Sequence, residues 1–314
     1  MCKILVTGGA GNIGSALVKK LLQRDQNYIV IADNLSTGSK SKLPSPSPKW
    51  KFIHCDINIY KEISAVITAN NFDYVFHYAA LVGVERTQQN PIRVLKDIDG
   101  IKYILELSKN TGVKRVFFSS SSEVYGEPVE LPQHEHTTPL NSRVPYAIVK
   151  NVGEAFLKSF KQEHDLDYTI FRFFNTYGVD QSSDFVVTRF IRAALNNHDI
   201  TIYGDGSQIR TFCYVDDNID ACLKTLYENK IVNDIINIGG DVTVKIIDLA
   251  KIITELTNSN SKIINLPPLK DGDMTRRQPD NSKMLSLLGR DLLPIEEGIK
   301  LMLADKNFVR SCVE

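Results

Sequence analysis

The sequence lacks the features of a membrane protein, a secreted protein or a disulfide-rich domain. No apolar run in its 314 residues is long enough to span a bilayer, and the N-terminal segment MCKILVTGG is too short for a signal peptide. The five cysteines are odd in number and scattered without CxxC spacing, which argues against a disulfide framework and against a zinc site. These absences favour a soluble, cytoplasmic protein with reduced thiols and no metal centre.

The chain also lacks an excess of charge of either sign. Lys and Arg together number 37, as do Asp and Glu. A neutral chain offers no global field that would hold nucleic acid or an anionic membrane, so neither is an expected partner. With 43% hydrophobic and 24% charged residues, the composition is that of an ordinary globular protein.

Short apolar runs alternate with longer amphipathic stretches through the first half of the chain. The runs lie at residues 3–6, 28–32, 51–54, 74–77, 115–118 and 168–173, and the helical patterns lie at 16–23, 59–69, 91–109 and 146–161. Nearly continuous apolar strands separated by helices indicate a parallel sheet that is covered on both faces. The pattern therefore predicts a Rossmann-type, doubly wound α/β fold.

The alternation weakens after residue 178, which predicts a second, smaller unit. We expect a Rossmann domain at residues 1–172 plus about 207–242, and a discontinuous C-terminal substrate lobe at about 173–206 plus 243–314. Such a lobe would lie over the carboxyl ends of the strands, where open α/β sheets bind their ligands.

A glycine-rich motif, TGGAGNIG, follows the first predicted strand and opens the first helix. Gly8, Gly11 and Gly14 suit a tight turn, a close approach of backbone to a pyrophosphate, and close packing of helix on sheet. The exposed N–H groups at the start of that helix, around Asn12 and Ile13, would bind the pyrophosphate. The motif predicts a dinucleotide site.

An acidic residue completes this motif at the end of the second strand. Asp33, followed by Asn34, lies about twenty positions after Gly14, the separation expected of a ribose-binding acid. Its carboxylate would accept hydrogen bonds from both ribose hydroxyls and repel a 2′-phosphate. The cofactor is therefore predicted to be NAD rather than NADP.

One tyrosine–lysine pair has the spacing and position of a catalytic pair. Among twelve tyrosines, only Tyr146 has a lysine four residues later, Lys150, and the pair opens an amphipathic helix. The i,i+4 spacing places both side chains on one face of that helix. We expect the ammonium and a positively charged nicotinamide to lower the pKa of the phenol, which ordinarily titrates near 10, so that it serves as a base.

Hydroxyl groups gather where the fifth strand ends, in FFSSSSEVYG. This end of the strand is where the fold binds substrate. Ser121 is expected to hydrogen-bond the reacting oxygen, and Glu123 could move a second proton. A serine-rich turn in which Glu123 has no catalytic role is the simpler alternative.

Taken together, these motifs resemble the extended short-chain dehydrogenase/reductases that act on nucleotide-sugars, among them UDP-glucose 4-epimerase and UDP-glucuronate decarboxylase. The resemblance covers nearly the whole chain. The matching segments are TGGAGNIG, DN at 33–34, HYAA at 77–80, SSSSEVYG at 119–126, PYAIVK at 145–150, RFFNTYG at 172–178, TIYGDGSQIRTFCYVDD at 201–217 and DMTRRQPDNSK at 273–283.

The resemblance implies roles for particular residues. Ser121, Tyr146 and Lys150 would form the catalytic triad. Asp56 and Ile57 would flank the adenine, while Ala79, Ala80 and Lys150 would line the nicotinamide half. Asn175, Arg210 and Arg277 would hold the substrate diphosphate, with further substrate contacts from Ser122, Thr201 and Tyr203. Relatives in this family often pair as homodimers through helices that correspond to residues 91–109 and 146–161.

Two departures from the family pattern bear on the reaction. Many members carry Asn where this chain has Asp97. The 4,6-dehydratases carry Asp-Glu after the catalytic hydroxyl residue, whereas Ser122 and Glu123 stand here, as in the decarboxylases. The missing acid argues against dehydration.

The expected chemistry is oxidation of a nucleotide-sugar at C4 to a 4-keto species, in the synthesis of polysaccharide precursors. A 4-epimerase (an isomerase) and a net C4 dehydrogenase (an oxidoreductase) fit equally well, and decarboxylation of a nucleotide-hexuronate is the alternative. A non-catalytic NAD-binding regulator is the rival from another class, and the intact Ser121, Tyr146 and Lys150 speak against it. The sugar and the nucleotide base are not encoded in any motif.

Overall fold

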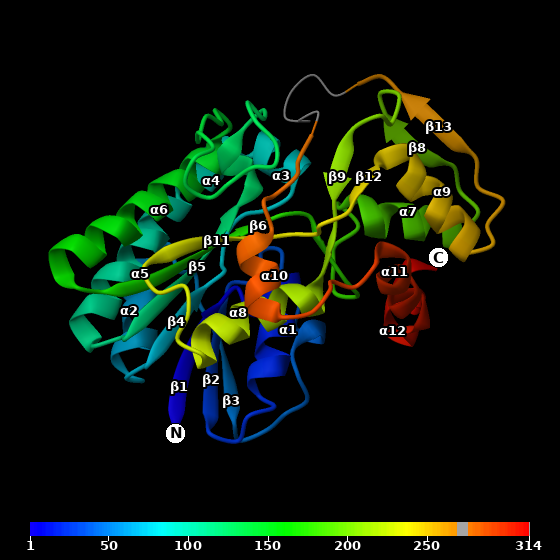
Figure 1. The fold of residues 1–314 in the computed structure, drawn as a ribbon. Helices are drawn as coiled ribbons and strands as arrows, with labels where there is room; N and C mark the ends of the chain where they lie inside the picture. Colours follow the sequence, from blue (N-terminus) through cyan, green and yellow to red (C-terminus); the bar gives the residue numbers. More distant parts are fainter. Residues whose placement is uncertain (269–275, 314) are drawn as a thin grey trace.

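The computed structural model of the protein describes residues 1–268 and 276–313, and its centre is a parallel sheet (Figure 1). Within these residues the sheet has seven strands in the order β11-β6-β5-β4-β1-β2-β3. They are β1 (Cys2–Thr7), β2 (Asn27–Asp33), β3 (Trp50–His54), β4 (Tyr74–His77), β5 (Arg115–Ser121), β6 (Asp167–Phe173) and β11 (Asp234–Ile238). The order reverses at β1, so the carboxyl ends of β1 and β4 form a topological switch point. The predicted Rossmann-type fold is confirmed.

Both faces of the sheet are buried, as the continuous apolar runs predict. Along β1, Leu5 packs into one hydrophobic core, while Ile4 and Val6 pack into the other, and all three side chains are fully buried. Successive residues of a strand point to opposite faces, so a strand buried on both sides has no polar alternation.

Helices from distant parts of the chain cover the two faces (Figure 1). The face of Leu5 is covered by α2 (Tyr60–Thr68), α5 (Asp97–Thr111) and α6 (Pro145–His164). The other face is covered by α1 (Asn12–Leu21), α8 (Val215–Tyr227) and α10 (Ser282–Leu288).

The helix predicted at residues 91–109 is divided in the structure, which corrects that expectation. The segment contains α4 (Pro91–Leu95) and α5, separated at Lys96, and α3 (Val84–Gln89) precedes it. The backbone N–H of Asp99 bonds the carbonyl of Lys96, an i→i+3 bond that tightens the chain at the junction. Between β2 and β3 the chain forms one short turn, η1 (Lys40–Lys42).

The C-terminal part of the chain contains three two-stranded sheets and further helices. The paired strands are β7 (Thr176–Tyr177) with β10 (Cys213–Tyr214), β8 (Ile200–Tyr203) with β13 (Ile263–Leu266), and β9 (Ile209–Thr211) with β12 (Thr243–Lys245). The helices are α7 (Val186–Leu195), α9 (Ile246–Leu256), α11 (Ile295–Ala304) and α12 (Lys306–Cys312). Their buried side chains join the same core as α1 and α8, so both parts share one hydrophobic interior.

The division of the chain into two domains stays a prediction, although the strand pairing bears on one boundary. Strand β9 lies within the span 207–242 predicted for the Rossmann domain, yet it pairs with β12 outside the central sheet. None of the helices in the described parts of the chain combines the length and apolarity needed to cross a bilayer. All five cysteines are free thiols, as expected.

Candidate active site

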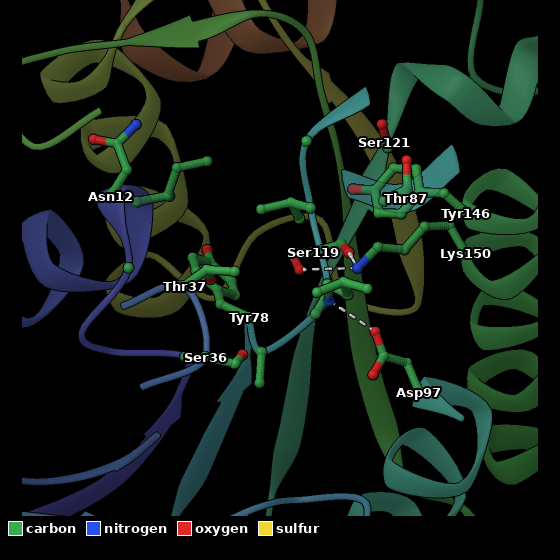
Figure 2. A pocket seen from close by; sticks show the side chains of 18 of the residues that line it. Asn12, Ser36, Thr37, Tyr78, Thr87, Asp97, Ser119, Ser121, Tyr146 and Lys150 are labelled. Atoms are coloured by element: carbon green, nitrogen blue, oxygen red, sulfur yellow. Dashed lines mark hydrogen bonds between the residues drawn. The ribbon is translucent and has the colours of Figure 1, made fainter. Parts of the chain in front are cut away.

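A cavity of about 1110 Å³ lies at the carboxyl ends of the central strands and reaches the C-terminal part of the chain. Its lining includes the residues predicted to bind the dinucleotide: Gly8, Gly11, Asn12, Ile13, Gly14, Asp33, Asn34, Asp56, Ile57, Ala79 and Ala80. It also includes Ser121, Ser122, Glu123, Tyr146, Lys150, Asn175 and Arg277. Figure 2 shows Asn12 on one side of the cavity, with Ser121, Tyr146 and Lys150 across from it.

The glycine turn leaves no room for side chains between β1, the start of α1 and the backbone after β4. Gly8 has a φ of +70°, and a Cβ atom there would lie 2.6 Å from the backbone nitrogen of Ala79. A Cβ on Gly14 would lie 2.2 Å from the carbonyl oxygen of Gly8. Gly11 is the N-cap of α1, so the unpaired N–H groups of the first helical turn begin at Asn12. The structure therefore has the tight glycine turn and the close packing of α1 that the motif predicts, while binding of a pyrophosphate there stays a prediction.

Two backbone hydrogen bonds orient the acid at the end of β2. Asp33 accepts a bond from the N–H of Ala10 at 3.0 Å through Oδ2 and one from the N–H of Leu35 at 2.7 Å through Oδ1. The adjacent Asn34 donates to Oδ2 of Asp56 at 3.1 Å, which joins the ribose and adenine ends of the predicted site. A carboxylate oxygen has more than one acceptor position, so Asp33 can still receive hydroxyl groups.

Ser121, Tyr146 and Lys150 converge as predicted, although the Lys150 ammonium donates its hydrogen bond to the backbone of β5. Ser121 is the last residue of β5, Tyr146 is the second residue of α6, and Lys150 follows one helical turn later. Lys150 Nζ donates to the carbonyl oxygen of Ser119 at 2.6 Å and lies 5.7 Å from the centre of the Tyr146 ring (Figure 2). Only 3% of the surface of Lys150 is exposed, and this burial lowers its pKa to about 8.

The protein by itself shifts the pKa of Tyr146 upward, against the direction expected from the sequence. Burial is the largest cause, and the Glu123 carboxylate adds to it. A hydrogen bond with Ser121 and the positive charge of Arg277 act in the opposite direction. Lys150 therefore does not lower the pKa of Tyr146 as the sequence predicted. The positive charge that opposes the upward shift is that of Arg277.

A partly buried ion pair joins two predicted site residues from distant segments. Arg277 Nη2 donates to Oε1 of Glu123 at 2.6 Å, and the two side chains are 10% and 15% exposed. Glu123 belongs to η2 (Ser122–Tyr125), which directly follows Ser121. Both charges act on the phenol of Tyr146, so Arg277 lies at the reacting end of the cavity. The sequence motif instead suggests that Arg277 contacts the diphosphate.

Three predicted substrate residues are outside the cavity lining formed by residues 1–268 and 276–313. Thr201 and Tyr203 belong to β8, and Arg210 belongs to β9, where its Nη1 donates to the carbonyl of Ile209 at 2.9 Å. Asn175 does line the cavity, with an unusual φ of +25° and a bond from Nδ2 to the carbonyl of Thr211 at 2.9 Å. Residues 273–275 of the predicted DMTRRQ segment lie outside the described residues.

The cavity also contains residues to which the sequence assigned no role. Asp97 is buried in the lining, accepting bonds from the N–H of Leu81 at 2.8 Å and from Asn58 Nδ2 at 3.0 Å. Burial raises the pKa of Asp97, and the charge of Lys150 opposes this shift. Thr87 of α3 also lines the cavity (Figure 2). In the sequence, Asp97 could have been recognised as a cavity residue because many family members carry Asn at this position. No sequence motif around Thr87 indicates that it lines the cavity.

Comparisons with known proteins agree with this geometry. Residues 4–239 match the family model described as NAD dependent epimerase/dehydratase family. UDP-glucuronic acid decarboxylase 3 from Arabidopsis thaliana is 34% identical over 313 residues, covering 96% of this chain and 88% of that protein. The UDP-glucose 4-epimerase of Thermotoga maritima, solved with UDP-glucose, has a TM-score of 0.91 at 32% identity, covering 98% of this chain and 99% of that one. The Thermus thermophilus UDP-glucose 4-epimerase complex with NAD has a TM-score of 0.89 at 27% identity, with the same coverage.

Proposed function

Because the chain belongs to the NAD-dependent epimerase/dehydratase family, we propose that it oxidises a nucleotide-linked sugar at C4 and acts as a 4-epimerase or as a net C4 dehydrogenase. The observation that carries this proposal is the convergence of Ser121, Tyr146 and Lys150 in the cavity that also contains the glycine cradle. The substrate class is a nucleoside diphosphate sugar. The family relatives include both epimerases and decarboxylases, so the second half of the reaction is the finer part of the proposal.

The residues of the cradle fit NAD. Gly8 and Gly14 have no space for a Cβ atom beside the neighbouring backbone, so the turn packs closely on the sheet and the N–H groups at the start of α1 can bind a pyrophosphate. Asp33, held by the N–H groups of Ala10 and Leu35, accepts the ribose hydroxyls in this proposal, and its charge excludes a 2′-phosphate. When bound, NAD supplies the hydride acceptor for the carbinol carbon.

The residues on the side of the cavity opposite Asn12 provide the proton chemistry (Figure 2). Tyr146 takes the proton of the C4 hydroxyl, and Ser121 hydrogen-bonds the same oxygen and holds it in line. Lys150 lies one helical turn away, with its Nζ 5.7 Å from the centre of the Tyr146 ring, while the positive charge that lowers the pKa of the phenol comes from Arg277. Reduction of the resulting ketone on its other face gives the 4-epimer, whereas release of the ketone gives net dehydrogenation.

The outcomes differ in mass and are therefore separable in one experiment. Purified protein is incubated with NAD and a panel of UDP-, GDP-, dTDP- and CDP-sugars, and the products are analysed by mass spectrometry and chromatography. An epimer has unchanged mass and a new retention time, a released ketone is lighter by two hydrogens, and a decarboxylated product is lighter by carbon dioxide. Retained NAD binding without turnover of any sugar would favour the non-catalytic regulator instead.

Decarboxylation of a nucleotide-hexuronate is the second candidate, and the Glu123–Arg277 pair favours it. A guanidinium at the reacting end of the cavity matches a carboxylate on the sugar, because Arg binds carboxylates through a planar fork. In a 4-keto hexuronate the carboxylate is β to the ketone, so carbon dioxide can leave as the electron pair moves to the keto oxygen. Glu123 is placed to take part in the proton transfer that follows at C5.

Replacing Arg277 by alanine tests this second candidate. We expect at least a thirtyfold loss of hexuronate turnover, because removal of one partner from a buried charge pair costs roughly 2 kcal/mol or more. The matched control is Arg276→Ala, since the side chain of this neighbour is exposed. Equal turnover of a hexuronate by both variants, followed by mass spectrometry, would contradict a role of Arg277 in decarboxylation.

We also propose that two copies of the chain pair through α4, α5 and α6. Ile92 and Leu95 of α4 are 75% and 41% exposed, and Ile148 of α6 is 40% exposed, although α4 packs against α6. Light scattering should give twice the chain mass for the wild type and a single chain mass for the double variant Ile92→Glu, Ile148→Glu. Leu301→Glu, an exposed apolar position on α11, is the control that should remain paired.

A further inference from the structure

A chain of buried hydrogen bonds begins behind the catalytic residues, and the proposed reaction does not use it. Its first member is Glu154 of α6, one helical turn after Lys150. Ser120 Oγ donates to Glu154 Oε1 at 2.6 Å. Arg172 of β6 donates to the same carboxylate twice, through Nε at 2.9 Å and through Nη2 at 2.6 Å. The bidentate geometry fixes the guanidinium plane.

The series of hydrogen bonds continues from Arg172 to β11. Arg172 Nη1 donates to the hydroxyl of Tyr125 and to the carbonyl of Glu135, both at 2.9 Å. The Tyr125 hydroxyl in turn donates to Oδ1 of Asn237 at 2.7 Å, and Asn237 Nδ2 donates to the carbonyl of Gln133 at 2.8 Å. None of these five side chains is more than 4% exposed, so the bonds are not shared with solvent.

This series of hydrogen bonds ends beside Arg277. The N–H of Gln133 donates to the carbonyl of Gln278 at 2.7 Å, and the N–H of Asp280 donates to the carbonyl of Gln133 at 2.8 Å. Arg277 itself lies in an irregular segment, where its N–H bonds the carbonyl of Ile209 at 3.2 Å. Its backbone position therefore depends on these few bonds rather than on a helix or a central strand.

We propose that Arg172 is a positioning residue that, through Tyr125 and Asn237, sets where the Glu123–Arg277 pair stands relative to the reacting sugar hydroxyl. Both members of the pair are close in sequence to residues of this hydrogen-bond series. Tyr125 follows Glu123 by two residues, and Gln278, whose carbonyl accepts from Gln133, follows Arg277 by one. A small displacement of charge in a low-dielectric cavity has a large effect on a developing negative charge. The proposal rests on the proposed function for its effect on turnover.

Replacing Tyr125 by phenylalanine tests the connection with little change in volume. It removes the hydroxyl between Arg172 and Asn237, and we expect turnover to fall about tenfold, with affinity for NAD unchanged because the glycine cradle is not part of the chain. Tyr227→Phe is the matched control, since it also removes a hydroxyl that accepts a hydrogen bond, here a partly buried one from Asn27 Nδ2 at 2.8 Å. Arg172→Lys keeps the charge beside Glu154 and should reproduce the Tyr125→Phe pattern.

Amide hydrogen exchange gives a second readout that does not depend on turnover. In Tyr125→Phe the N–H groups of Gln133, Asn237 and Asp280 should exchange faster than in the wild type, while those of Gly8 and Gly11 do not change. Unchanged exchange at the first three positions, or equal kcat in Tyr125→Phe and Tyr227→Phe, would overturn the proposal. A wild type that turns over no nucleotide-sugar would refute the proposed function alone, and exchange would then decide whether the chain of bonds holds the Arg277 segment.

Discussion

Tyr146→Phe is expected to lower turnover of the nucleotide-sugar by about a thousandfold, a typical contribution of a well-placed general base. The ring remains in place against α6, so only the proton-accepting oxygen is lost. The structure gives a reason for a large effect, because burial and Glu123 already hold the pKa of this phenol above its ordinary value. Activation of the phenol therefore depends on the charges beside it, of which Arg277 is the one that lowers its pKa. Rates are measured by chromatography of the sugar products at saturating NAD.

The control for this prediction is Tyr227→Phe, which removes a hydroxyl from α8. Both variants should bind NAD as the wild type does in isothermal titration calorimetry, and both should unfold within a few degrees of it. A Tyr146→Phe enzyme with full turnover would refute Tyr146 as the base. A variant that loses activity together with NAD binding would indicate damage to the cavity rather than to the chemistry.

Lys150→Met should lower turnover by about a hundredfold while leaving thermal stability undiminished. Lys150 is 3% exposed, and its pKa falls from 10.5 to about 8 on burial, so the charged form is disfavoured in the folded protein. Methionine has similar length and no charge to bury, which offsets the lost bond to Ser119. Loss of activity without loss of stability is typical of a residue retained for function.

The pH dependence of Lys150 provides a sharper measurement. Wild-type turnover should decline as the pH rises through about 8, where the lysine loses its proton, and Lys150→Met should lack this limb. Between pH 8 and 10.5 the unfolded chain binds a proton at this position that the folded chain has released, so wild-type stability should rise with pH relative to the variant. Lys158→Met, an exposed position of the same helix, is the control. Its pH profile should match that of the wild type, and an identical limb in Lys150→Met would contradict the assignment.

The ambiguity between epimerase and decarboxylase has a structural basis. In the proposed mechanism the proton chemistry at C4 uses Ser121, Tyr146 and Lys150 in either reaction, so we expect the residues that choose the outcome to lie beyond them. Glu123 and Arg277 are placed to do so, since their charges reach Tyr146 and their positions depend on a separate chain of buried bonds. Substrate choice is therefore expected to respond to variants at Arg172 and Tyr125 as well as at the pair itself.

The sequence by itself determined those features that depend on short-range periodicity and on local geometry. The apolar runs specified a sheet buried on both faces, the glycine spacing specified the cradle at Gly8 and Gly14, and the i,i+4 spacing placed Tyr146 and Lys150 on one helix face. Each depends on backbone geometry within a few residues, which composition and order alone encode. The single helix expected at 91–109 was wrong: the structure divides it at Lys96, and no periodicity of the apolar residues marks that junction.

Only the tertiary structure decided the electrostatics of the site. Glu123 and Arg277 form a pair across the cavity from segments far apart in sequence, and no local pattern marks that contact. Likewise, the pKa of Tyr146 moves upward because packing removes water from the phenol, a quantity that the spacing to Lys150 does not contain. Thr201, Tyr203 and Arg210 match the family motif, but among the described residues they do not line the cavity; they belong to β8 and β9, which pair outside the central sheet. Burial and long-range charge pairing are properties of the assembled core, and they are set only when the chain has folded.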